Sequence, residues 1–355
     1  METHTNTEHN NRLVYLDYIK ALGISLVILY HCNYVPFESM LIRGIYAMCV
    51  PLFFAVNGFL MLRKEYSLHQ LFKKNLKLLF VLFFWGFVSA FVYMICNSDF
   101  DAFNRGWLEK SKYLIFCTFT TKVPECDHLW FLKALFILNL LNPVFHRFVY
   151  NNKQGLLYLL VLMAIWSIDF FDIASAKFVN PFLHWMTAYS VLYYLVGYAV
   201  LTEQLPYRVS NRVNQLSFII VSLFICMLSQ WGYNWLLMEG PLLHLNQEKG
   251  WLVDIVWDNY NALFVVLMTA ITILLFRNIK WKSNRFWSFV GKNSLAIYVL
   301  QTPVQRLLDH FSPLSHLAQG HHSFGLILPI LTLLGSMGIT WLLKTNRYTE
   351  FLITL

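Results

Sequence analysis

Residues 13–34 read LVYLDYIKALGISLVILYHCNY, and this stretch decides the fold class of the chain. It is long enough to cross the hydrocarbon core of a bilayer as one helix, which takes about 20 predominantly apolar residues. It also carries Asp17, Lys20 and His31, ionisable side chains that are rare on a lipid-facing helix. The stretch therefore predicts a transmembrane helix whose charged side chains face a partner or a cavity inside a bundle.

Nine further apolar stretches follow, so the sequence predicts an all-α polytopic membrane protein with about ten transmembrane helices. The 355 residues are 57% hydrophobic and 13% charged, with a mean hydropathy of +0.51. Soluble domains carry roughly 25% charged residues, so this composition excludes a soluble enzyme, a disordered chain and a disulfide scaffold. The stretches are also too long for the alternating strands of a barrel. The predicted helices cover residues 13–34, 44–62, 78–96, 129–145, 155–171, 182–201, 216–238, 255–276, 289–308 and 324–343.

The basic residues of the connecting segments predict the orientation, because cytoplasmic loops of membrane proteins are enriched in lysine and arginine. More than half of the 27 basic residues fall on one set of alternating loops, so we interpret the net charge of +8 as a topology signal and not as a nucleic-acid site. Both termini are then cytoplasmic, as an even number of spans requires. We expect a cytoplasmic tail over 1–12, a transmembrane domain over 13–344 and a cytoplasmic tail over 345–355.

The ionisable residues of the first stretch share one helical face. Lys20 and His31 are eleven residues apart, which is three turns plus 20° and about 16 Å along the axis. Asp17 lies three residues before Lys20, within reach of an ion pair. Two interpretations fit this spacing. Asp17 and Lys20 extend to the inner interface and His31 to the outer one, or the three line a polar path with His31 as a general base.

Five short motifs follow one another along nearly the whole chain. They are Leu16-Asp17 with Lys20 and His31, PLFFAVNGFL at 51–60, FKKNLK at 72–77, HLWFL at 128–132 and GKNSLAIYVL at 291–300. In this order they resemble the acyltransferase-3 family of polytopic membrane acyltransferases. Lys20 stands where the family has arginine, Asn57 where serine is common and Gln301 where many members have histidine. A lysine cannot bind a phosphate in the bidentate way of arginine.

The resemblance implies an O-acyltransferase that moves an acyl group, usually acetyl, from cytosolic acyl-CoA to a hydroxyl of a surface or exported polysaccharide. It implies His31 and Asp17 as catalytic residues, with His31 either a base or a transient acyl carrier. It implies Lys20 and the cluster Lys73, Lys74 and Lys77 as donor-binding residues. It implies His128 and Trp130 as acceptor-binding residues. In a bacterium such a protein would sit as a multi-pass protein in the cell (cytoplasmic or inner) membrane.

Several of these residues also have a purely structural interpretation. Trp130 is typical of an aromatic anchor at the membrane interface, and the lysine cluster is typical of a topology signal. Asn57 and Gly58 are typical of a tight contact between helices.

We expect no tightly bound cofactor, since acetyl-CoA or another acyl-CoA is the donor substrate. The predicted partners are that donor, a polysaccharide or lipid-linked glycan, and the lipid bilayer, but no nucleic acid. Several histidines lie near residues 309–323, without carboxylate or cysteine ligands at fixed spacing, so no metal site is predicted. Two other functions stay open, namely a transporter or flippase of a glycan or lipid-linked sugar and an accessory subunit of a polysaccharide synthase.

Overall fold

The computed structural model describes residues 13–32, 45–96, 112, 127–166, 188–202, 212–238, 240–241, 263–311 and 326–354. The described residues form helices and contain no strand. The elements are α1 (Val14–Cys32), α3 (Cys49–Leu62), α4 (Leu68–Cys96), η1 (Asp127–Leu129), α7 (Trp130–Val149), α8 (Lys153–Trp166), α10 (Ala188–Leu201), α11 (Arg212–Met238), α14 (Leu263–Asn278), α15 (Arg285–Lys292), α16 (Ser294–Phe311), α18 (Ile327–Lys344) and α19 (Arg347–Glu350).

The prediction of an all-α polytopic membrane protein is confirmed. Each of the ten predicted stretches contains a helix among the described residues. Four helical segments are long and apolar enough to cross a membrane, namely Val14–Cys32, Leu68–Tyr93, Trp130–Val149 and Ile327–Lys344. The number of ten spans and the cytoplasmic position of both termini stay predictions.

Two helix boundaries differ from the sequence-based expectation. The third helix begins at Leu68 and not at Leu78, so the lysine cluster 73–77 is helical. The start is specified by a capping box, in which the Ser67 amide donates to Gln70 Oε1 (3.2 Å) and the Gln70 amide donates to Ser67 Oγ (3.3 Å). The ninth stretch is divided at Asn293, whose side-chain Nδ2 donates to the carbonyl of Phe289 (2.8 Å) at the end of α15.

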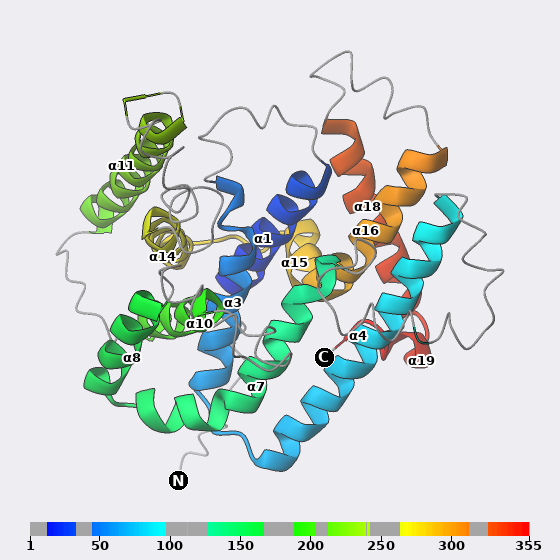
Figure 1. Ribbon diagram of the computed structural model, residues 1–355, viewed down its shortest axis with the longest axis horizontal. Coiled ribbons are helices and arrows are strands. Elements are labelled where there is room, and N and C mark those ends of the chain that lie inside the picture. The colour runs from blue at the N-terminus through cyan, green and yellow to red at the C-terminus, as the bar shows by residue number, and fades with distance from the viewer. Residues whose placement is uncertain are drawn as a thin grey trace, which may run out of the picture.

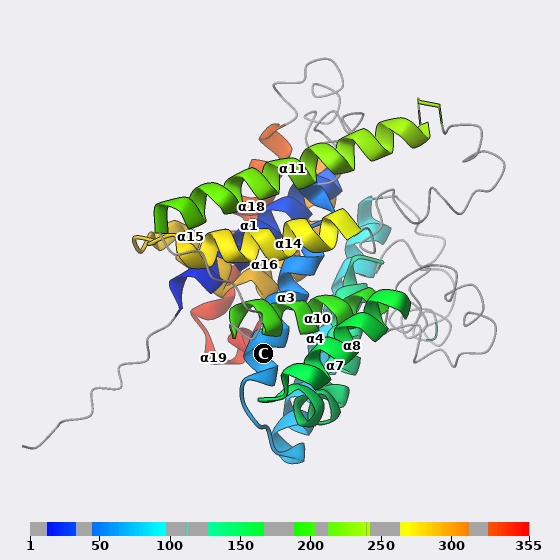
Figure 2. The ribbon, with the colours of Figure 1, turned by 90° about the vertical axis from the view of Figure 1, so that its left-hand side faces the viewer.

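Helix α1 lies in the middle of the bundle (Figure 1). It packs against α3, α14, α15, α16 and α18, which come from distant parts of the chain. Helix α11 lies at one side of the molecule and runs beside α14, as Figure 2 shows. The residues of the first predicted helix therefore lie in the interior of the bundle, in contact with five other helices.

The bundle has apolar side chains on its outside, as expected for a surface in contact with lipid. Large hydrophobic side chains are exposed along the peripheral helices, whereas several polar side chains are buried between helices. The exposed set includes Leu157, Tyr158 and Val161 on α8, Phe218, Phe224 and Ile225 on α11, and Ile330, Leu334 and Trp341 on α18.

Helices α3 and α10 approach closely through two glycines. A Cβ on Gly58 would overlap the carbonyl oxygen of Tyr194, and a Cβ on Gly197 would overlap that of Ala55. Small residues let transmembrane helices bring their backbones together. The structural interpretation of Gly58 as part of a helix contact is therefore correct.

Gly197→Ala is expected to lower the stability of the bundle by about 1–3 kcal/mol, because the new methyl group meets backbone atoms that cannot rotate away. The measurement is the thermal unfolding midpoint of the purified full chain in detergent. The matched control is Gly232→Ala on α11, where no described atom lies within 4 Å of the added Cβ. Equal midpoints for the two variants would show that the α3–α10 crossing tolerates a wider spacing.

Candidate functional site

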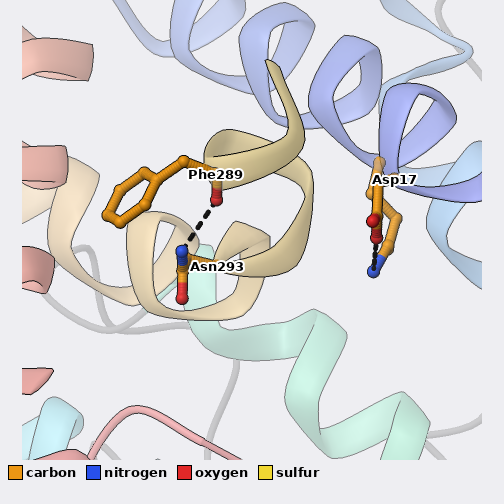
Figure 3. A network of polar contacts seen from close by, with 4 residues as sticks. Asp17, Phe289 and Asn293 are labelled. Atoms are coloured by element: carbon orange, nitrogen blue, oxygen red, sulfur yellow. Dashed lines mark hydrogen bonds and ion pairs between the residues drawn. The ribbon is translucent and has the colours of Figure 1, made fainter. Parts of the chain in front are cut away.

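The N-terminal part of α1 contains the predicted ion pair. Lys20 Nζ lies 3.2 Å from Asp17 Oδ1, and the two side chains are 22% and 6% exposed. Figure 3 shows this pair on α1 beside the junction of α15 and α16, where Asn293 binds Phe289. A carboxylate at this degree of burial is stable only when it has a partner of opposite charge or hydrogen-bond donors.

The segment before α16 fixes the position of the ion pair. The Tyr18 hydroxyl donates to the carbonyl of Lys282 (2.7 Å) and accepts from the amide of Asn284 (2.7 Å). The Tyr18 ring also meets the Trp281 ring edge to face at 4.9 Å. Gly291 of α15 lies against the backbone of Asp17 so closely that a Cβ there would overlap the Asp17 carbonyl oxygen. The start of the fifth motif, at Gly291, therefore packs directly on the first motif at Asp17.

The C-terminal part of α1 carries His31, which is half-buried. Gln305 Nε2 of α16 donates to the carbonyl of His31 (2.9 Å), and the Arg306 guanidinium lies within electrostatic range of the imidazole. The Tyr30 ring meets the His31 ring at 5.5 Å. Helix α16 thus brings the Gln305 amide to the His31 backbone and the Arg306 guanidinium within electrostatic range of the His31 ring.

The face of α1 between Lys20 and His31 is apolar. Ile24 and Val27 lie four and seven residues after Lys20, on the same side of the helix. They are 0% and 2% exposed. Packed aliphatic side chains therefore separate Lys20 from His31, so this face of α1 is not a continuous polar path.

His128 lies in η1 at the start of α7 and is 5% exposed. The Tyr298 hydroxyl donates to its carbonyl oxygen. Neither ring nitrogen has a hydrogen-bond partner among the described residues. The imidazole lies within electrostatic range of His31 and Arg306, so the structure brings together two histidines and an arginine from α1, η1 and α16.

Trp130 packs within the bundle. Its ring lies 6.1 Å from the Phe54 ring and 6.1 Å from the Tyr189 ring. These contacts place the Trp130 ring among aromatic side chains of the bundle, and its role in acceptor binding stays a prediction.

The three lysines of the predicted donor cluster point to different neighbours. Lys73 is exposed. Lys74 Nζ lies over the Tyr66 ring at 4.1 Å, and Lys77 Nζ donates to Thr354 Oγ1 (3.1 Å). Lys73 and Lys77 lie one turn apart on the same side of α4, whereas the described contacts of Lys74 and Lys77 are with Tyr66 and Thr354. Lys73 is the member most available to a ligand in solution.

Other polar side chains near the histidines were not assigned to the site from the sequence. Lys133 and Gln301 are fully buried, and both side-chain atoms of the Gln301 amide lack a hydrogen-bond partner among the described residues. Lys133 lies within electrostatic range of His128. Gln301, Gln305 and Asp309 recur every fourth position, which marks one polar face of α16 and is the signal that would have found Gln301, whereas no such spacing marks Lys133 on α7.

This arrangement suits acid–base chemistry on an uncharged group. Two imidazoles can accept or donate protons, and the neighbouring guanidinium can stabilise negative charge that develops during a reaction. The positive side chains at the other end of α1 can attract an anionic substrate.

Comparison with known proteins agrees with this geometry. A family model described as an acyltransferase domain (Acyl_transf_3) matches residues 13–342. The match begins just before α1 and ends within α18, so it includes every residue of the candidate site. No curated protein sequence and no solved structure matches the chain significantly.

Asp17→Asn and Lys20→Met form a double-mutant cycle on the buried pair. Lys20→Met leaves the carboxylate of Asp17 without its ion-pair partner, so we expect the two effects to be coupled by about 1 kcal/mol. The measurement is the thermal unfolding midpoint of the wild type, both single variants and the double variant. Lys153→Met, which changes an exposed lysine, is the control. Strict additivity would contradict a stabilising Asp17–Lys20 interaction.

Proposed function

Because this chain belongs to the acyltransferase-3 family, we propose that it transfers an acetyl group from cytosolic acetyl-CoA to a hydroxyl of a surface or exported polysaccharide. That it is a membrane acyltransferase follows from the family and from its apolar helices. The donor, the acceptor and a position in the cell (cytoplasmic or inner) membrane belong to the proposal.

The group formed by His31, His128 and Arg306 carries the proposal. Ionisable side chains within a membrane domain are costly, so such a group indicates function more strongly than it would in water. His31 and His128 come from two motifs separated by nearly a hundred positions, and the fold brings both within electrostatic range of Arg306.

The donor is proposed to bind at the N-terminal end of α1. Lys20 is 22% exposed on its side chain, and Lys73 is exposed. Both provide positive charge for the phosphates of coenzyme A. Lys20 and His31 are about 16 Å apart along the helix axis, so the extended pantetheine arm is needed to bring the thioester toward His31. Lys74 and Lys77 are both engaged by neighbouring side chains. We propose that they do not contact the phosphates and only add to the positive potential at this end of the bundle.

In the proposed reaction, His31 removes the proton of the acceptor hydroxyl as its oxygen attacks the thioester carbonyl carbon. A carbon–oxygen bond forms, the carbon–sulfur bond breaks, and the proton on His31 passes to the departing CoA sulfur. Arg306 stabilises the negative charge on the carbonyl oxygen in the transition state. Asp17 does not touch the reacting groups in this proposal and acts by pairing with Lys20. His128 is proposed to bind the acceptor.

A two-step route uses the same residues. The His31 nitrogen first attacks the thioester and forms an acyl-histidine with release of the CoA thiol, and the hydroxyl then takes the acyl group. Both routes require His31 in its neutral form at the moment of attack.

His31→Ala is expected to lower acetyl transfer by about 100-fold or more, because the reaction loses its general base or its acyl carrier. The measurements are CoA release from acetyl-CoA by the purified chain and base-labile acetate on the surface polysaccharide of cells that express it. The matched control is His146→Ala, which removes a half-buried histidine stacked on Tyr150 (4.6 Å) in the last turn of α7.

Unchanged acetylation by His31→Ala at a normal protein level would overturn the catalytic assignment. A wild-type protein that consumes no acetyl-CoA but moves labelled sugar across vesicles would instead establish the transporter.

A further inference from the structure

A pocket of about 240 Å³ lies between the C-terminal ends of α4 and α16. It is lined by Tyr93 and Cys96 of α4 and by Arg306, Asp309 and His310 of α16. The predicted topology puts these helix ends on the outer face of the membrane. The volume suits a single sugar ring, which leaves the rest of a glycan outside.

The pocket adjoins the catalytic end of α1 through Gln305. The Gln305 side chain donates to the carbonyl of His31 (2.9 Å) and also hydrogen-bonds Asp309. Arg306 lines the pocket and lies within electrostatic range of the His31 ring. The pocket therefore lies beside the turn of α16 that contacts the C-terminal part of α1, where His31 stands.

The lining is polar and its cation is held in place. The Arg306 guanidinium lies 4.7 Å from the centre of the Tyr93 ring, and Cys96 Sγ contacts the Arg306 carbonyl oxygen at 3.5 Å. Asp309 is half-buried, and its Oδ1 is buried without a hydrogen-bond partner among the described residues. A buried carboxylate oxygen without a donor is costly, so a ligand that supplies a donor gains free energy there.

We propose that this pocket is the acceptor site, that it takes one hydroxyl-rich sugar residue, and that Asp309 determines acceptor binding by accepting hydrogen bonds from ring hydroxyls. The inference rests on the proposed function, because it assigns the alcohol substrate of that reaction. The hydroxyl to be acylated points to His31, and exposed His310 stands at the rim.

The chemistry of the lining separates acceptor from donor. Coenzyme A carries several negative charges, whereas the lining sets the Asp309 carboxylate against the Arg306 cation and so offers the phosphates no excess of positive charge. A sugar offers hydroxyl donors in the geometry that a carboxylate accepts, and its ring is small enough to enter. The pocket therefore assigns the two substrates to opposite ends of α1, which places the thioester and the alcohol on either side of His31.

The test uses the full chain with Asp309→Ala and Asp309→Asn, and Lys153→Ala as the control for an exposed charge far from the pocket. One measurement is acetyl-CoA hydrolysis by purified protein with water as the acceptor. The other is base-labile acetate in cells, determined separately in the polysaccharide fraction and in the lipid-extractable fraction. The two fractions distinguish a finished polysaccharide from a lipid-linked glycan, which share the same hydroxyl chemistry.

We expect Asp309→Ala to lower acetate on the glycan at least tenfold, with Asp309→Asn in between and with hydrolysis within twofold of the wild type. Normal glycan acetylation by Asp309→Ala overturns the acceptor assignment. An equal loss of hydrolysis and transfer in Asp309→Ala, with an unchanged unfolding midpoint, also overturns it, because the residue would then act on the donor or on chemistry. A wild type without hydrolysis or transfer overturns the proposed function itself, which is a different result.

Discussion

The hydrocarbon core of a membrane cannot satisfy a charged or hydrogen-bonding side chain, and this constraint organises the bundle around α1. Asp17 and Lys20 satisfy each other at 3.2 Å, and the α15 region closes over them. At the other end, Gln305 and Arg306 of α16 meet His31. Two of the helices that cover α1, α15 and α16, therefore lie against its polar residues.

The apolar middle of α1 gives the bundle two separate polar ends. Ile24 and Val27 are packed between Lys20 and His31, so the described state is closed along this face. A closed middle keeps ions and water from crossing the membrane. An acyl chain, being apolar, can be accommodated there at lower cost than a phosphate. In the proposed reaction, the acyl chain reaches this apolar face while the charged part of the donor stays at the N-terminal end of α1.

The sequence predicts much of the fold, because long apolar runs and the need for internal hydrogen bonds leave helices as the only solution. The Asp17–Lys20 pair follows from a spacing of three residues on a helix. The start of α4 was missed because Lys73, Lys74 and Lys77 resemble a loop signal, while Ser67 and Gln70 form a cap that specifies a helix. Helix propensity and the Ser67–Gln70 capping box determine where α4 begins, and the start of the apolar run does not.

The candidate site was predictable only in part, since contacts between distant segments leave little trace in a single sequence. His31 stands out because histidine is conspicuous in an apolar run, whereas His128 was assigned only through the resemblance of HLWFL at 128–132 to a family motif. Arg306 and Asp309 did not, because they lie near the end of a span where charges are ordinary. Their part in the site depends on how α16 packs against α1 and α4, which no local pattern determines.

The lysine at position 20 has a consequence for how the donor is held. Its Nζ is already paired with Asp17, and the usual arginine of the family would present a planar fork to a phosphate instead. An ammonium group has three donors, so the pairing with Asp17 does not by itself exhaust the hydrogen-bonding capacity of Lys20. Asp17 then fixes the direction of the ammonium group, and its own negative charge weakens the attraction to the phosphate. Binding of the donor should therefore depend more on the summed positive field of this end of the bundle than on Lys20 alone.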